Sequence, residues 1–573
     1  MVTGAPLAIR VRTMAAFAAI GMAVFGQALA AEVSYDLVIH GGTIYDGSGD
    51  DPYVGDVAVR GDRIVALGKT GEIDAAGARR VLDATGKAVS PGFINLMSHA
   101  QETLLVDGRA QSDIRQGVTL EVMGEGFSWG PLDEDMKADM VASQSDFRYE
   151  VAWSTLGEYL EHLVERGVSP NVASFIGAAN PRIQVLGYED RAPTPDELAR
   201  MQDIVRQAMR EGALGVASSL IYPPGYFAGT PELVALAAAA GEYGGIYATH
   251  MRNEGNALLE AIDETIQIAR EAGVPAEIYH LKQAGRPNWH KLDDAIRKIE
   301  EARAQGLSIT ADMYTYPAAS TGLSSVLPPW VQEGGQEAFI ARLEDPETRA
   351  RIIAEMQKPT KEWEQMLALT GAENIILVGF ASEKLKPLTG RTLAEVAEKR
   401  GVTPEVAAIE LLIEDNSRIM SVYKMMSEDN VRRQVALPWM SFCSDSPAYT
   451  NEGVFLKSMT HPRAYGSFAR LLGKYVREEQ VIPLEEAIRK LAARPAETLG
   501  LERRGRLAEG YYADIVIFDA DRVTDHATYE DPHRYATGVE HVFVNGVQVL
   551  ADGEHTGATP GRVVRGPGWR GER

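Results

Sequence analysis

The amino-acid sequence predicts an α/β protein: a (β/α)8 barrel of the TIM type, with a β-sandwich domain built from both chain ends. In the middle of the chain, short β-rich runs alternate with helical stretches eight times, which is typical of a parallel sheet wrapped by helices. Both chain ends instead carry successive β-rich runs separated by turn residues. With 573 residues, 45% of them hydrophobic, the chain is long enough to bury both cores.

The N-terminal segment has the pattern of a cleavable signal peptide. Two arginines precede an apolar stretch at residues 14–25, and Ala28-Leu29-Ala30 supplies the small residues typical of a cleavage site. The stretch is short for a bilayer span, which disfavours the alternative of a membrane anchor; an ordinary buried helix is the other alternative. We therefore expect residues 1–30 to be removed. The expected location is the periplasm, with secretion as the alternative and no stable membrane insertion after processing.

The β-rich runs of the two chain ends are expected to form one β-sandwich from residues 31–90 and 496–573. At the N-terminal end, runs at 35–40 and 43–45 flank a predicted Gly41-Gly42 turn, and runs at 56–60 and 64–67 follow. At the C-terminal end the runs are 513–518, 542–544 and 547–549, the last two separated by Asn545-Gly546. Such glycine-containing pairs are typical of hairpin turns.

The barrel is expected to occupy residues 91–495. Its eight candidate strands are 93–96, 118–123, 172–176, 214–218, 245–248, 276–279, 307–311 and 440–443. A long insertion at 318–437 precedes the last strand and carries helical patterns near 336–356 and 404–414. Barrels of this type place their chemistry at the C-terminal ends of the strands, so the polar residues that follow each run are the candidates for function.

Charge and cysteine content restrict the chemistry. The 57 Lys and Arg residues face 80 Asp and Glu, a net charge of −23 that argues against nucleic acid as a partner and favours a small-molecule enzyme. The single cysteine, Cys443, cannot form an intramolecular disulfide or a multi-cysteine zinc site. Any metal must therefore be held by histidines and carboxylates.

Histidines and carboxylates do follow several of the candidate strands. His99, Glu125, His250, His280 and Asp445 come after the first, second, fifth, sixth and eighth strands. Singly, each could be a structural histidine or a helix cap. Together they converge on one end of the barrel, where unpaired charge would be costly and a divalent cation would neutralise it. The sequence therefore predicts a metal site.

Motifs spread over the whole mature chain are similar to those of a known family. They include residues 35–49, 117–128, 213–225, 247–254, 280–285 and 312–317, the stretch His461-Pro462-Arg463-Ala464-Tyr465-Gly466, and Val544-Asn545-Gly546. On these motifs the chain resembles the N-acyl-D-amino-acid deacylases, or D-aminoacylases, of the amidohydrolase superfamily. The resemblance implies a metal-bearing barrel with a β-sandwich assembled from both chain ends, and a hydrolase of carbon–nitrogen bonds other than peptide bonds.

The resemblance also implies roles for individual residues, and this chain departs from the family at two of them. His250 and His280 match metal ligands and Asp445 matches the catalytic aspartate. Where the family has an H-x-H pair, this chain has Met97-Ser98-His99, and Glu125 stands nearest the position of a bridging cysteine. A thioether is a poor zinc ligand, whereas a glutamate can replace a bridging thiolate.

These departures leave alternatives. Met97 is expected to be a core residue, and His99 is either a weak ligand or a polar residue beside an emptied site. Glu125 either binds metal or forms a salt bridge with Arg252. We predict one tight divalent ion, expected to be zinc, at Glu125, His250 and His280, which leaves an open position for water. A second ion at His99 and Asp445, sharing Glu125, is expected to be weak or absent.

The expected reaction is hydrolysis of the amide bond of an N-acyl amino acid, by resemblance an N-acyl-D-amino acid, to a carboxylate and a free amino acid. The resemblance implies that Lys282, Tyr314 and Arg463 hold the α-carboxylate and that Tyr222 lines the binding site. One alternative is an exported amidohydrolase acting on peptides or cyclic amides. The other, suggested by Met97, is a non-catalytic binding protein on a degenerate barrel.

Overall fold

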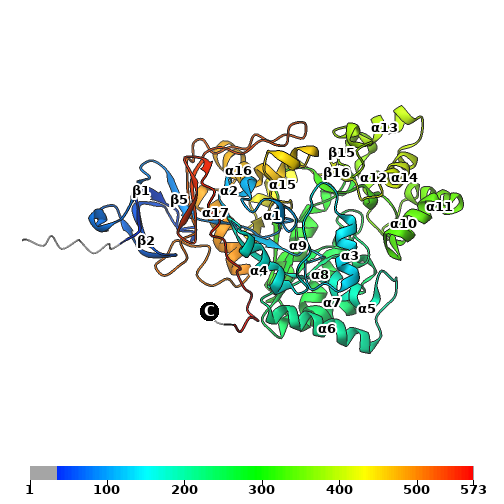
Figure 1. Ribbon diagram of the computed structural model, residues 1–573, viewed down its shortest axis with the longest axis horizontal. Helices are drawn as coiled ribbons and strands as arrows, with labels where there is room; N and C mark the ends of the chain where they lie inside the picture. Colours follow the sequence, from blue (N-terminus) through cyan, green and yellow to red (C-terminus); the bar gives the residue numbers. More distant parts are fainter. Residues whose placement is uncertain (1–34, 572–573) are drawn as a thin grey trace, which may run out of the picture.

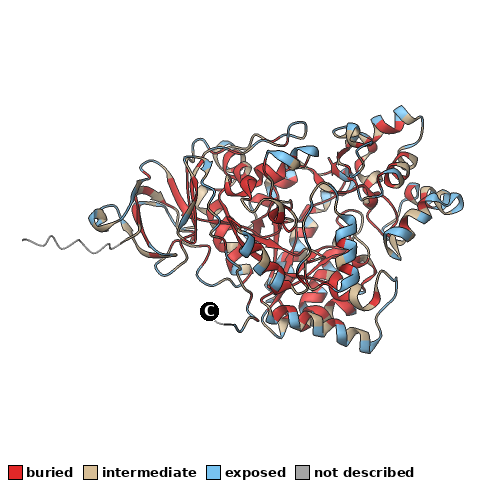
Figure 2. Cartoon of the chain, viewed as in Figure 1, coloured by how far each residue is buried: buried red, intermediate tan, exposed pale blue. Residues whose placement is uncertain are grey.

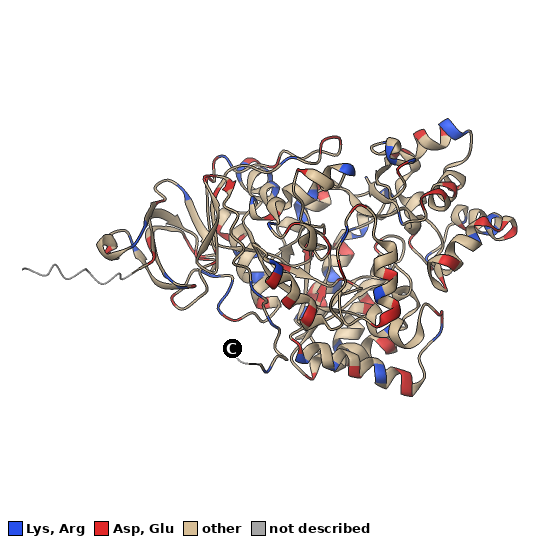
Figure 3. Cartoon of the chain, in the orientation of Figure 1, with Lys and Arg blue, Asp and Glu red and all other residues tan. Residues whose placement is uncertain are grey.

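A computed structural model of the protein describes residues 35–571 (Figure 1). A group of strands lies at one end, an α/β body occupies the centre, and a lobe of helices with a small sheet lies at the other end. The predicted signal peptide, residues 1–30, lies outside the described residues. Among residues 35–571, no helix is long and apolar enough to cross a membrane. Acidic and basic residues are interspersed along the helices (Figure 3).

Strands from both chain ends form one nine-stranded mixed sheet. Its order is β21-β20-β19-β18-β5-β1-β2-β3, with β4 paired to β1. The strands are β1 (Leu37–Ile44), β2 (Tyr53–Arg60), β3 (Arg63–Lys69), β4 (Val81–Asp83), β5 (Ala88–Pro91), β18 (Ile515–Phe518), β19 (Val539–Val544), β20 (Val547–Ala551) and β21 (Glu554–His555). The junction is the antiparallel pair β5–β18, in which Val89 faces Ile517. The expected union of the two ends is confirmed, but hydrogen bonds join the strands in one sheet and not in two separate ones.

The predicted Gly41-Gly42 turn is wrong, because β1 runs through both glycines. The register of β1 against β2 shifts between Ile39 and Gly42, which is a β-bulge. Gly41 adopts a φ of 71°, a value that glycine tolerates best, and its N–H donates to Asp56 Oδ1 at 2.8 Å. The bulge thus accommodates the glycines without reversing the chain. In contrast, Asn545-Gly546 makes the turn between β19 and β20 as predicted.

All eight predicted barrel strands are present, and they lie in two parallel sheets. One has the order β6-β7-β8 and the other β17-β13-β12-β11-β10-β9. The strands are β6 (Phe93–Asn95), β7 (Val118–Met123), β8 (Asn171–Ser174), β9 (Ile176–Gly177), β10 (Gly215–Ser219), β11 (Ile246–His250), β12 (Ala276–Ile278), β13 (Ile309–Met313) and β17 (Met440–Phe442). The third predicted strand is divided at Phe175 into β8 and β9.

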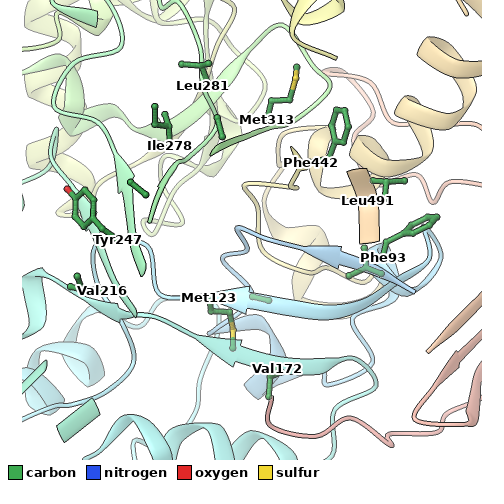
Figure 4. Close-up of a cluster of buried hydrophobic side chains, with 14 of the residues drawn as sticks. Phe93, Met123, Val172, Val216, Tyr247, Ile278, Leu281, Met313, Phe442 and Leu491 are labelled. Carbon is green, nitrogen blue, oxygen red and sulfur yellow. The ribbon is translucent and has the colours of Figure 1, made fainter. Parts of the chain in front are cut away.

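Side chains of these strands alternate between two hydrophobic cores. Figure 4 shows one core, to which every predicted strand contributes: Phe93, Met123, Val172, Val216, Tyr247, Ile278, Met313 and Phe442. Leu233, Ile262 and Ile299, from helices α7 (Thr230–Gly241), α8 (Leu258–Ala272) and α9 (Leu292–Ala304), belong to the same core. The strand neighbours Ile94, Ala173, Ala217, Ala248 and Cys443 pack in the second core. Each strand is therefore buried on both faces, as in parallel sheets covered by helices.

Further helices surround this body. They are α1 (Thr103–Val106), α2 (Gln111–Ile114), α3 (Glu134–Ser143), α4 (Leu156–Arg166), α5 (Ala179–Leu186), α6 (Pro195–Arg210), α15 (Glu428–Val435), α16 (Arg463–Arg470), α17 (Leu484–Ile488) and α18 (Arg494–Thr498). After β21 the chain returns to the body: Val172 donates to Arg562 O at 2.9 Å and accepts from Val564 N at 2.8 Å. Residues 562–564 therefore lie alongside β8.

The insertion between β13 and β17 is a lobe with a core of its own. Its helices are α10 (Gly335–Glu344), α11 (Pro346–Gln357), α12 (Met366–Thr370), α13 (Leu393–Arg400) and α14 (Pro404–Asp415). The predicted helix at 336–356 is present but is divided at Asp345, which caps α11 by accepting the Thr348 N–H. The lobe also contains an antiparallel sheet that was not predicted: β14 (Ala319–Gly322), β16 (Met420–Tyr423) and β15 (Ile375–Gly379). Figure 2 shows buried residues on the inward-facing sides of these helices.

Candidate metal centre

The structure brings together three side chains that the sequence predicted as ligands. Glu125 follows β7, His250 ends β11 and His280 follows β12. Ligand atoms of the three lie within 4.8 Å of one another. Glu125 Oε1 is 3.1 Å from His250 Nδ1 and 3.4 Å from His280 Nε2. Two imidazole nitrogens and a carboxylate oxygen, all buried or nearly so, form a donor set that suits a divalent ion such as zinc.

Left-handed backbone positions place two of the site residues. His280 has a φ of 37° and Asp445 a φ of 48°, both uncommon for residues with side chains. The His280 N–H donates to Asp312 Oδ1 at 2.6 Å, and the Asp445 N–H donates to Met97 O at 3.1 Å. These contacts hold the two side chains toward the same end of the strands.

Glu254, which sequence reasoning missed, lies behind both histidines. Its Oε1 is 3.1 Å from His280 Nδ1, and its Oε2 is 3.5 Å from His250 Nε2. Each histidine therefore turns one nitrogen toward Glu125 and the other toward Glu254. A carboxylate behind a ligand histidine fixes the ring and its tautomer. The available signal was its position in the Thr249–Glu254 stretch, four residues after His250.

Both carboxylates of this cluster are anionic. Burial opposes ionisation of Glu125, but hydrogen bonds from His250 and His280 outweigh it and hold the pKa of that carboxyl well below its usual range. Burial also opposes ionisation of Glu254, yet the nearby Lys282 ammonium and the two histidines lower its pKa to about 2. The cluster thus has two carboxylates around two imidazoles. Because Lys282 already binds Glu254, Glu125 supplies the negative charge that a bound cation would neutralise.

The second half of the predicted centre is less complete. His99 Nε2 lies 3.1 Å from Asp445 Oδ1 and 3.4 Å from Glu125 Oε2, and 32% of the His99 side chain is exposed. Met97 is 1% exposed and packs in the second core with Ile94 and Ala248, as expected for a core residue. Of the predicted ligands, His99, Asp445 and the shared Glu125 make up this half.

Asp445 lies between His99 and Arg463. Its Oδ2 accepts a hydrogen bond from Arg463 Nη1 at 2.5 Å. Burial raises the pKa of Asp445, but the Arg463 guanidinium and His280 outweigh it and hold that pKa well below its usual range. The carboxylate is therefore ionised at neutral pH and can accept a proton.

The predicted substrate residues gather around the same cluster. Arg463 Cζ is 4.5 Å and Lys282 Nζ 5.9 Å from the centre of the Tyr314 ring. The Tyr222 ring centre is 5.4 Å from that of His250. Lys282 Nζ also contacts the Glu254 carboxylate at 2.7 and 2.8 Å, so both basic residues already neutralise an acid of the site.

The alternative in which Glu125 forms a salt bridge with Arg252 is wrong. Arg252 binds Glu264 of helix α8 through two contacts of 2.9 Å. Its Nη groups also donate to backbone carbonyls of residues 226 and 228. Arg252 follows His250 closely in the sequence, but its acidic partner is Glu264 of α8, the helix after β11.

Comparisons with known proteins identify the family of the chain. The family model described as "Amidohydrolase family" matches residues 80–550. D-aminoacylase of Alcaligenes xylosoxydans xylosoxydans is 34% identical, over 92% of this chain and 97% of the relative. A solved D-aminoacylase, described as having a binuclear metal centre with one-metal activation and second-metal attenuation, is 32% identical with a TM-score of 0.76, covering 93% of this chain and 100% of that chain.

A second solved relative adds a ligand-bound example. N-acyl-D-glutamate deacylase from Bordetella bronchiseptica, complexed with zinc and a phosphonate inhibitor, is 30% identical with a TM-score of 0.75, covering 93% of this chain and 99% of that chain. The similarity in each case extends over nearly the whole of both chains. The chain therefore belongs to the amidohydrolase family, in the group of the D-aminoacylases.

Proposed function

We propose that this protein is a metal-dependent hydrolase that cleaves the amide bond of N-acyl-D-amino acids to a carboxylate and a free amino acid. The observation that carries the proposal is the buried Glu125, His250 and His280 cluster, with Asp445 beside it. The relatives named D-aminoacylase and N-acyl-D-glutamate deacylase support the substrate class. The D configuration of the substrate is inferred from those relatives.

The metal would be held by Glu125, His250 and His280, with zinc as the expected ion and one ion per chain. A second ion at His99 and Asp445 would be weak or absent. When bound at such a site, a divalent ion polarises the scissile carbonyl and lowers the pKa of a coordinated water to about 7. Glu254, which lies 3.1 Å from His280 and 3.5 Å from His250, would keep both imidazoles oriented for binding such an ion.

The protein's own residues would perform the proton transfers and hold the substrate. Asp445 would accept the proton that the attacking water loses and deliver it to the leaving nitrogen as the C–N bond breaks. The Arg463 guanidinium keeps this carboxylate ionised and in place. Lys282, Tyr314 and Arg463 would hold the α-carboxylate, and Tyr222 would line the site next to His250.

We further propose that the two parallel sheets close into one (β/α)8 barrel. Backbone hydrogen bonds support closure at both gaps. At one gap, Asp445 N donates to Met97 O and His99 N to Ser446 O, each at 3.1 Å. At the other, Leu214 N donates to Ser174 O at 3.0 Å, which links β8 to the start of β10.

Residues 1–30 support the further proposal of an exported protein that acts in the periplasm, with secretion as the alternative. A periplasmic enzyme of this kind would meet small N-acylated compounds released outside the cytoplasm. Sequencing the N-terminus of protein recovered from the periplasm tests this: an intact Met1 would contradict cleavage near Ala31.

Purified protein tests the main proposal directly. N-acetyl-D- and N-acetyl-L-amino acids should be incubated with zinc-loaded protein, and the free amine measured. We expect turnover of D-isomers that is lost on chelation and restored by zinc. Turnover of peptides or cyclic amides alone would favour the alternative hydrolase. A protein that takes up no metal and hydrolyses nothing would be the non-catalytic binder.

A further inference from the structure

An exposed arginine from the insertion reaches the edge of the candidate site. Arg418 lies in the loop between α14 and β16 and is exposed. Its Cζ lies 5.0 Å from the centre of the Tyr222 ring. The Tyr222 ring in turn contacts His250, so one aromatic ring separates the guanidinium from a proposed metal ligand.

Among the residues that the structure describes, Arg418 has no acidic partner, unlike the other basic residues of the site. Within residues 35–571, no Asp or Glu lies within 4.0 Å of its nitrogens, and its one side-chain hydrogen bond is a long contact to Thr321 Oγ1 at 3.5 Å. Lys282, Arg463 and Arg252 each bind a carboxylate. In a chain with 80 acidic and 57 basic residues, an unneutralised guanidinium at a site entrance is available to an anion.

The backbone holds Arg418 in place at some cost in strain. The next residue, Ile419, has a φ of 50°, a left-handed value that is an outlier for a β-branched side chain. Such strain is concentrated at functional sites. Leu323 N donates to Ile419 O at 2.8 Å and keeps the loop against β14. A Cβ at Gly322 would lie 3.0 Å from both Cβ and Nε of Arg418, so the glycine makes room for the side chain.

Adjacent residues of β14 link Arg418 to Arg463. Arg463 Nη2 donates to Ser320 O at 3.3 Å. The next residue, Thr321, contacts Arg418 Nη2 and lies 2.8 Å from the Tyr222 hydroxyl. Successive residues of a strand are about 3.3 Å apart along its axis. The two guanidinium groups are thus anchored to neighbouring points beside the same site.

We propose that Arg418 binds a second carboxylate of the substrate, so that the enzyme prefers N-acyl amino acids carrying two negative charges. The inference rests on the proposed function and narrows its substrate class. A guanidinium stacked over an aromatic ring keeps its N–H edge free for a carboxylate, which it can bind through two hydrogen bonds. The second carboxylate belongs either to an acidic amino-acid side chain or to a dicarboxylic acyl group.

Four substrates and two variants test this proposal. N-acetyl-D-glutamate and N-succinyl-D-leucine carry the second charge in the two positions, while N-acetyl-D-glutamine and N-acetyl-D-leucine lack it. Hydrogen bonds to charged groups correspond to about a 10- to 100-fold effect. We therefore expect kcat/KM for one of the dianionic compounds to exceed that of its singly charged counterpart by this factor. In Arg418→Ala the ratio of these two kcat/KM values should approach one, mainly because KM for the dianionic compound rises.

Arg391→Ala is the matched control. Arg391 is also an exposed arginine of the insertion, but it pairs with Glu395 on the surface of α13 at 3.5 Å. This variant should keep the wild-type ratio. The enzyme's preference for one of the two dianionic compounds should disappear in Arg418→Ala. That compound identifies the position of the second carboxylate.

The outcomes separate the inference from the proposed function. If the wild-type enzyme hydrolyses singly charged and dianionic compounds equally well, or if Arg418→Ala keeps the preference, the role of Arg418 is wrong while the deacylase function stands. If zinc-loaded wild-type protein hydrolyses no N-acyl amino acid, both proposals are wrong. Circular dichroism of Arg418→Ala confirms that a change in the ratio does not come from loss of the fold.

Discussion

The two halves of the candidate metal centre differ in how completely they are built. At the first half, Glu125 faces two buried histidines, and Glu254 with Lys282 lies behind them. At the second half, His99 is one-third exposed and its ring faces Asp445 and the shared Glu125. A position that could supply a further ligand there holds Met97, which packs in the core. The halves thus differ in their histidines: the first half has two buried ones with a carboxylate behind them, and the second has one that is partly exposed.

Glu125→Ala is expected to have the largest effect, because it removes the anionic ligand of the complete half. Metal polarisation contributes several kcal/mol to the transition state, so activity should fall by about 1000-fold or more. Metal analysis of the purified variant should show that the ion is lost together with activity. A variant that keeps its metal would contradict the assignment of the tight ion to this half.

Asp445→Asn is expected to affect turnover but not metal content. The substitution removes the proton acceptor with little change in volume, and general acid–base catalysis contributes about 100- to 10,000-fold. The measurement is kcat alongside the metal content of the same preparation. Near-normal turnover would show that Asp445 is not the proton shuttle.

Glu254→Gln should weaken metal binding more modestly. Loss of a carboxylate that orients ligand histidines typically lowers metal affinity about 10- to 100-fold. Competition with a chelator of known affinity measures the change. His99→Ala, on the incomplete half, is the control and should leave the affinity for the tight ion near the wild-type value. An equal loss of metal affinity in Glu254→Gln and His99→Ala would contradict the assignment of the tight ion to the first half alone.

Met97→His should have the smallest effect and acts on the incomplete half. It offers one more protein ligand beside His99, Asp445 and the shared Glu125, so zinc titration should show a higher occupancy of a second ion. Placing an imidazole in the core costs about 1–3 kcal/mol when its polar atoms are not satisfied, so Tm should fall. An unchanged stoichiometry would show that geometry, and not the missing ligand alone, limits the second ion.

The sequence predicted the parallel strands well because short β-rich runs alternate with helical stretches along this part of the chain. Val118–Met123 was predicted with its observed ends, and the strand-end positions of Glu125, His250 and His280 follow from it and its neighbours. The Gly41-Gly42 pair predicted a turn because glycine pairs occur in β-bulges as well as in hairpin turns. The distinction depends on pairing with β2, which is not visible in the local sequence.

Residues that act through distant contacts could not be predicted. Glu254 was missed because its role depends on His280 and Lys282, which arrive from the next strand. Glu364, in the insertion, accepts the Glu254 N–H at 2.7 Å from 110 residues away. Likewise, Lys282 was assigned to substrate from resemblance, whereas its contact with Glu254 depends on how two loops fold together.

The junction between β5 and β18 also has a consequence for how the chain is made. Residue 91 ends β5 and residue 515 begins β18, so about 420 residues separate the two partners. At a synthesis rate of about 5–20 residues per second, roughly 20 to 85 seconds pass between the synthesis of β5 and the synthesis of β18. During that interval an unpaired strand edge is open to other chains. Completion of this sheet is therefore a late event in biosynthesis, and nascent chains stalled before residue 515 should need chaperone protection to remain free of aggregates.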